Sequence, residues 1–120
     1  MKERGQITIE TTLTYSIDVK ALQDEEKKEI DSSVEKLIRL SQGTVFPKCL
    51  YRSRSHTFPN RSISPEKSTL YLYKASKRYR IILSFDDDPV FNQRLIRLFR
   101  VVPREQSVRC FKDVATLLYK

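Results

Sequence analysis

Cationic side chains are concentrated in the middle of this chain. Residues 43–82 hold nine Lys or Arg residues and a single acid, Glu66, whereas residues 1–42 carry −2 and residues 83–120 carry +2. The whole chain of 120 residues has a formal net charge of +8. Each cation that meets a phosphate releases a counterion, so a concentrated basic block favours a nucleic-acid ligand. A solubilising surface, or a surface for an acidic protein partner, is the alternative interpretation.

Three arginines in the C-terminal half could stabilise negative charge on a phosphate. Arg80 and Arg100 fall in two successive expected strands, and Arg104 follows the second of them. A guanidinium suits this role because it stays charged and can bond two phosphate oxygens at once. We expect Arg80 and Arg100 to share one face of adjacent antiparallel strands. The alternative is that they point outward from the sheet or pair with the acids at 86–88.

The other reactive side chains do not form a recognisable catalytic or metal motif. His56 is the single histidine, and with Cys49 it lacks the further ligands that a zinc site requires. Three consecutive Asp residues at 86–88 cannot all point at one ion, so they are typical of a hydrophilic turn. The two glycines of the chain do not make a phosphate-binding loop. We therefore expect neither a metal nor a cofactor.

Two expected elements precede the basic block. Residues 6–17 carry apolar side chains at alternate positions, which predicts a half-buried strand. Asp18 could cap a short turn. Asp24 could cap a helix that ends at Gly43, since the apolar residues after it follow helical spacing. These residues are Ile30, Val34, Leu37 and Ile38.

Residues 44–68 differ in character from the rest of the chain. Prolines and serines interrupt any periodicity there, which predicts a long basic loop. Strand patterns return from residue 69, with turns expected at 74–77 and 86–89, and helical spacing resumes from Val108 to the C-terminus. This order predicts an α+β fold with a largely antiparallel sheet.

Size and composition bound the remaining properties. A chain of 120 residues with 39% hydrophobic residues is typical of a single domain, which we place at 1–120. No apolar run is long enough to cross a membrane, and the first residues lack the apolar segment of a secretory signal. The two cysteines are most simply read as reduced thiols in a cytosol. We expect a cytoplasmic protein without a membrane association.

One stretch resembles a known family. Tyr79-Arg80-Ile81-Ile82-Leu83-Ser84-Phe85-Asp86-Asp87, followed by Leu98-Phe99-Arg100-Val101-Val102-Pro103-Arg104-Glu105, is similar to the strand pair of the RelE/ParE toxin superfamily of bacterial toxin–antitoxin systems. The resemblance implies a curved, mainly antiparallel sheet with an N-terminal strand–helix unit and a C-terminal helix. It also implies an antitoxin protein as partner and RNA or the ribosome as target.

The resemblance also assigns roles to residues. It implies that Arg80, Arg100 and Arg104 are catalytic. RNA-binding roles are expected for five nearby cations, which are Lys74, Lys77, Arg78, Arg52 and Arg54.

Several positions depart from the family pattern, among them Val102-Pro103, which stand where the family has Gly-His at the end of the strand. Tyr71 and Tyr73 stand where many members carry lysines, and Cys110 and Phe111 stand where the family places a catalytic Tyr or a His-Tyr pair. Besides an unrelated α+β domain whose basic loop binds a partner subunit, two functions on this fold therefore remain open. One is a ribosome-dependent mRNA endoribonuclease with reduced activity, and the other is a non-catalytic protein that binds RNA or a protein target.

Overall fold

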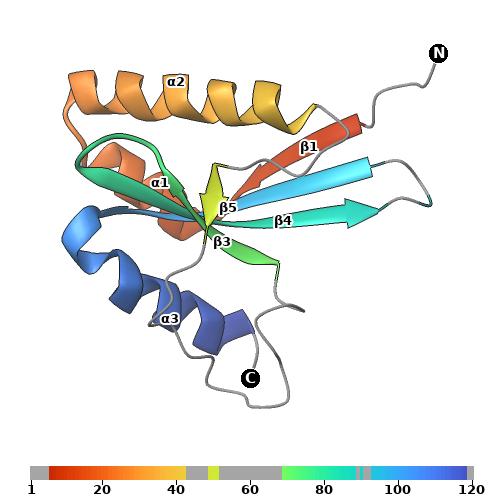
Figure 1. Cartoon of the computed structure of the whole chain (residues 1–120). Helices are drawn as coiled ribbons and strands as arrows, with labels where there is room; N and C mark the ends of the chain where they lie inside the picture. The colour runs from red at the N-terminus through yellow and green to blue at the C-terminus, as the bar shows by residue number, and fades with distance from the viewer. Residues whose placement is uncertain (1–5, 43–48, 52–68, 89, 91–92, 119–120) are drawn as a thin grey trace.

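A computed structural model describes residues 6–42, 49–51, 69–88, 90 and 93–118 (Figure 1). Within these ranges the chain forms one five-stranded sheet with the strand order β1-β5-β4-β3-β2. The elements in chain order are β1 (Gln6–Thr11), α1 (Leu13–Lys20), α2 (Asp24–Ser41), β2 (Leu50–Tyr51), β3 (Leu70–Lys74), β4 (Tyr79–Asp88), β5 (Gln93–Pro103), the 3-10 turn η2 (Arg104–Gln106) and α3 (Ser107–Leu118).

The sheet is mainly antiparallel, as expected. β2 pairs with β3, β3 with β4 and β4 with β5 in antiparallel register, whereas β1 runs parallel to β5. β5 therefore lies inside the sheet, which agrees with its mostly apolar sequence. The N-terminal strand–helix unit, the sheet and the C-terminal helix together agree with the RelE-like α+β fold expected from the sequence.

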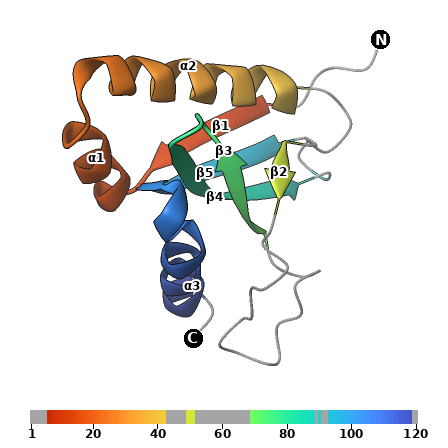
Figure 2. The same cartoon turned by 60° about the vertical axis from the view of Figure 1, so that its left-hand side comes forward.

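Helices cover both faces of the sheet. α2 packs over one face and α3 lies against the other, as the two views show (Figures 1 and 2). The larger core, on the α2 side, includes Ile30 and Leu37 of the helix and Ile81 and Leu83 of β4. The smaller core joins Phe111 and its neighbours on α3 to the opposite face of β3 and β4.

The expected strand over 6–17 is correct only as far as Thr11. Residues 13–20 form helix α1 instead, because the Thr12 hydroxyl accepts a hydrogen bond from the Tyr15 N–H at 3.1 Å and caps the helix. Leu13 and Ile17 are exposed, whereas Tyr15 is buried. Their alternate spacing therefore did not reflect one buried strand face.

The N-cap of α2 also differs from the expectation. Gln23, rather than Asp24, precedes the first helical residue, and its backbone N–H donates to Glu26 Oε1 at 3.1 Å. Asp24 lies in the first turn with Glu25 and Glu26, where carboxylates favour the positive end of the helix dipole.

One expected turn and part of the expected long loop form strands instead. β4 continues to Asp88, so the acids at 86–88 belong to a strand, and Asp87 pairs with Arg94 at 3.6 Å. Leu50–Tyr51, inside the predicted 44–68 loop, form the short strand β2 against β3. Residues 44–48 and 52–68 lie outside the described residues.

A β-bulge interrupts the pairing of β4 with β5. Ile82 pairs with Arg100 and Leu83 with Leu98, which leaves Phe99 without an opposite residue. The Phe99 carbonyl accepts a hydrogen bond from the Thr12 hydroxyl at 3.0 Å. The bulge therefore lets Leu98 and Val101 both reach the α2-side core and turns Arg100 to the other face.

Candidate nucleic-acid interface

Four exposed cations gather at one end of the sheet. Lys74 ends β3, Lys77 and Arg78 lie in the turn between β3 and β4, and Arg104 follows β5 directly. We call these four residues the hairpin cation cluster. Because β3, β4 and β5 are consecutive neighbours in the sheet, the turn and the end of β5 meet at the same end.

A short backbone contact brings the two parts of the cluster together. The Arg104 N–H donates to the Arg78 carbonyl at 2.7 Å, just beyond the Tyr79–Pro103 pair of the sheet. Lys74 lies opposite Arg80 in the β3–β4 register, so it projects toward the α3 side of the sheet. The fold thus assembles cations that are thirty residues apart in sequence into one exposed group.

The acids beside the cluster come from the first turns of α2. Glu26 Oε2 accepts a hydrogen bond from the Tyr79 hydroxyl at 2.8 Å and lies 3.6 Å from Arg78 NH1. The Arg78 side chain is 80% exposed, so this ion pair is solvent-screened and weak. The hydrogen bonds that Glu26 accepts from the Tyr79 hydroxyl and from the Gln23 N–H lower the pKa of Glu26. The hydrogen bond to Glu26 raises the pKa of Tyr79.

Arg80 and Arg100 lie on the same face of adjacent strands, as the alternation predicts. Ile82 pairs with Arg100, and Arg80 lies two residues before Ile82 on the same side of β4. Their guanidinium groups, however, have internal partners. Arg80 is only 8% exposed, and its NH1 donates to three carbonyl oxygens of the β3–β4 turn.

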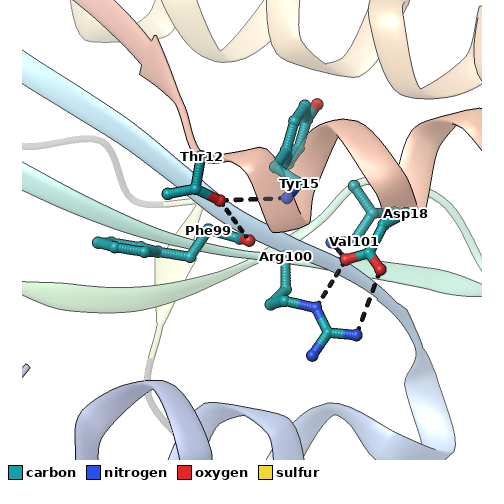
Figure 3. Close-up of polar contacts among 6 residues, drawn as sticks. All are labelled: Thr12, Tyr15, Asp18, Phe99, Arg100 and Val101. Carbon is teal, nitrogen blue, oxygen red and sulfur yellow. Dashed lines mark hydrogen bonds and ion pairs between the residues drawn. The ribbon is translucent and has the colours of Figure 1, made fainter. Parts of the chain in front are cut away.

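Arg100 is held by Asp18 of α1 in a two-point contact (Figure 3). Its Nε donates to Asp18 Oδ2 at 2.7 Å and its NH2 to Asp18 Oδ1 at 3.2 Å. The Val101 N–H donates to the same carboxylate at 3.0 Å. The Asp18 hydrogen bonds raise the pKa of Arg100, and this charge-assisted contact attaches α1 to β5.

The two tyrosines and the Cys110-Phe111 pair, which differ from the family pattern, pack in the two cores. Tyr73 is 4% exposed and donates its hydroxyl to the Ser33 carbonyl at 2.8 Å, and burial raises its pKa. Tyr71 packs against the same α2-side core, away from the Arg80 face. Phe111 and Cys110 lie on α3 and are buried against the sheet, and burial raises the pKa of the Cys110 thiol. These side chains are placed for packing rather than for proton transfer.

Arg52 and Arg54, which were expected to bind RNA, lie outside the described residues, as does the single histidine, His56. In the part of the chain that the structure describes, no three His, Cys, Asp or Glu side chains come close enough to hold a metal ion. No helix among these residues is long and apolar enough to cross a membrane.

Two residues of the site were not singled out for it from the sequence. Asp18 was expected to cap a turn, and its contact with Arg100 spans 82 positions, which no local pattern reveals. Glu26 was expected only as a favourable acid in a first helical turn, although its side chain reaches Tyr79 on β4. The acids of the first turn of α2 were a readable signal for the helix start, but not for the contact with the hairpin.

Two solved structures are similar to this chain. The crystal structure of YafQ from E. coli strain BL21(DE3) matches with a TM-score of 0.49 at 17% sequence identity, and a YafQ mutant from E. coli matches with a TM-score of 0.49 at 18% identity. Each match covers 85% of this chain and 98% of the other chain. No family model matches the chain, and no curated protein matches it. A likeness at this level carries no inference about activity.

Proposed function

We propose that this chain is a RelE-like toxin that acts by binding RNA, in isolation or on the ribosome, and that it cleaves RNA weakly if at all. The observation that carries the proposal is the contrast between two sets of cations. The hairpin cation cluster is exposed, whereas Arg80 and Arg100, expected to be catalytic, are engaged with internal acceptors. An antitoxin protein is the partner that a toxin of this class requires.

Cleavage of RNA needs more than positive charge. The ribose 2′-hydroxyl must lose a proton to a base, and the leaving oxygen must gain one from an acid. Tyr73, Cys110 and Phe111 are buried in the cores and do not reach an exposed phosphate site. The endoribonuclease function that the family resemblance implies therefore has less support than binding.

The hairpin cation cluster suits a single-stranded phosphate backbone. Its four side chains are exposed, and cations of this kind give affinity that depends on salt rather than on sequence. Tyr79, half-buried next to Arg78, lies in a groove of about 190 Å³ between α2 and the hairpin. Glu25, Glu26 and Glu29 also line this groove, so phosphate is expected on the open side of the cluster and not in the groove.

The test compares two variants that lose equal charge. In the first, Lys74, Lys77, Arg78 and Arg104 are changed to Gln; in the control, four exposed cations elsewhere, Lys20, Lys36, Arg39 and Lys112, are changed to Gln. Binding of a fluorescent single-stranded RNA is measured by anisotropy at low salt. The cluster variant should lose affinity by more than tenfold relative to the control, on the order of 10²-fold in all. Equal losses in the two variants would contradict the proposed site.

A cleavage assay on translating ribosomes distinguishes the two functions. Wild type and Arg80→Ala are expected to show no robust cleavage of mRNA. Robust cleavage by wild type that disappears in Arg80→Ala would support the endoribonuclease instead.

A further inference from the structure

Arg80 is a buried cation without an acidic partner among the described residues. It is 8% exposed, and each ion pair found in this part of the chain joins other residues. Burying a charge is costly unless it is hydrogen-bonded, so the partners of its guanidinium decide what it does.

Those partners are all in the turn that carries part of the hairpin cation cluster. Arg80 NH1 donates to the Ser76 carbonyl at 2.7 Å, to the Tyr79 carbonyl at 3.1 Å and to the Lys77 carbonyl at 3.4 Å. The contacts bracket Lys77 and Arg78 on both sides. Bonds from a charged donor are about twice as strong as neutral ones, so the guanidinium is a strong constraint on the turn.

Other contacts make the turn a small unit whose shape sets the position of its cations. The Ala75 and Ser76 N–H groups both donate to the Tyr79 carbonyl at 3.2 Å, and the Tyr79 N–H donates to the Ser76 hydroxyl at 3.1 Å. The Arg78 carbonyl accepts from Arg104. Arg80 thus holds the turn that carries Lys77 and Arg78, and Arg104 is attached to the same turn through the Arg78 carbonyl.

We propose that Arg80 is a positioning residue: it shapes the β3–β4 turn so that Lys77 and Arg78 can bind RNA phosphates together with Arg104, and it does not contact the phosphate itself. This inference rests on the proposed RNA-binding function. It replaces the catalytic role that the family resemblance implies for Arg80 with an indirect one.

A double-mutant cycle measures whether Arg80 acts through its neighbours. Arg80→Gln alone should weaken RNA binding by about tenfold, because two cations lose their alignment with the phosphates. In a background that already carries Lys77→Gln and Arg78→Gln, Arg80→Gln should change affinity by less than about twofold, since coupled residues are not additive. Independent, additive losses would show that Arg80 binds phosphate directly and would overturn the proposal.

Arg80→Lys keeps the charge and provides a second variant if Arg80→Gln folds poorly. An ammonium does not reproduce the planar donor geometry of a guanidinium. Arg80→Lys should therefore lose about three- to tenfold in RNA affinity while its thermal midpoint stays close to wild type. Affinity equal to wild type would contradict the positioning role.

Amide hydrogen exchange separates this inference from the function on which it rests. Arg80→Gln should speed exchange at the N–H groups of Tyr79 and Arg104, with no change in the core amides of α2 and β5. If wild type binds no RNA, the proposed function is wrong, but faster exchange at these two amides would still support the positioning role. Unchanged exchange would overturn it.

Discussion

Phe111 fills the core between α3 and the sheet, with 1% of its surface exposed. Because the sequence places it near the catalytic tyrosine of the resembling family, Phe111→Tyr is the obvious attempt to restore cleavage. We predict that this variant does not cleave RNA on translating ribosomes, and that it is less stable by about 1–3 kcal/mol because a hydroxyl is added to an apolar site. Urea unfolding measures the stability.

Leu117→Tyr gives the matched control for Phe111→Tyr. Leu117 is on the same helix and is 72% exposed, so the change should alter the free energy of unfolding by less than about 0.5 kcal/mol. Cleavage by Phe111→Tyr that Leu117→Tyr lacks would show that Phe111 faces the RNA.

Asp18 of α1 accepts hydrogen bonds from the Arg100 guanidinium and from the Val101 N–H of β5. Asp18→Ala should lower the free energy of unfolding by about 1–3 kcal/mol, because Arg100 and the Val101 N–H both lose their acceptor. Glu35→Ala, at an exposed position of α2, is the control and should change it by less than about 0.5 kcal/mol. Equal effects in the two variants would refute a structural role for Asp18.

At the scale of elements, α2 is attached to the hairpin by Glu26 and Tyr79. The pKa of Glu26 is lowered from 4.5, so this contact stabilises the fold above that pH and the contribution is lost as the pH falls through the lowered value. In Tyr79→Phe the largest cause of the lowered pKa is removed. The urea midpoint should therefore fall less between pH 7 and pH 3 in Tyr79→Phe than in wild type.

Glu29→Gln provides the comparison for that pH effect, since Glu29 is an exposed acid on the same helix. It should keep the wild-type fall in the urea midpoint. If Tyr79→Phe also kept it, the Glu26–Tyr79 contact would not contribute to the pH dependence.

Some helices and strands could be predicted from the local sequence pattern, and others could not. Helices α2 and α3 were predictable because each buries an apolar face at helical spacing, and strands β3 and β5 because each is a mostly apolar run that contributes to both cores. Residues 13–17 were not, because apolar residues at i, i+2 and i+4 indicate a strand, whereas in helix α1 Tyr15 lies on the opposite face from Leu13 and Ile17 and is the one of the three that is buried. The Thr12 cap decides between them, and it depends on contacts with β5 that lie 87 positions away.

At the scale of the whole molecule, the parallel pairing of β1 with β5 brings the first strand beside the last. No turn signal specifies such a pairing, so the sequence predicted a largely antiparallel sheet without the position of β1. The candidate site shows the same limit. The exposed cations were predictable as a charge excess, whereas the internal partners of Arg80 and Arg100 required the fold.

The most direct test of the RNA-binding function is the salt dependence of binding. Log affinity for single-stranded RNA should fall linearly with log salt concentration, with a slope of about −0.7 for each phosphate neutralised. Changing Lys74, Lys77, Arg78 and Arg104 to Gln should reduce the steepness of that slope by about 2 to 3, whereas the control at Lys20, Lys36, Arg39 and Lys112 should leave it unchanged. A wild-type affinity that does not vary with salt, or equal slopes in the cluster variant and the control, would contradict RNA binding through the hairpin cation cluster.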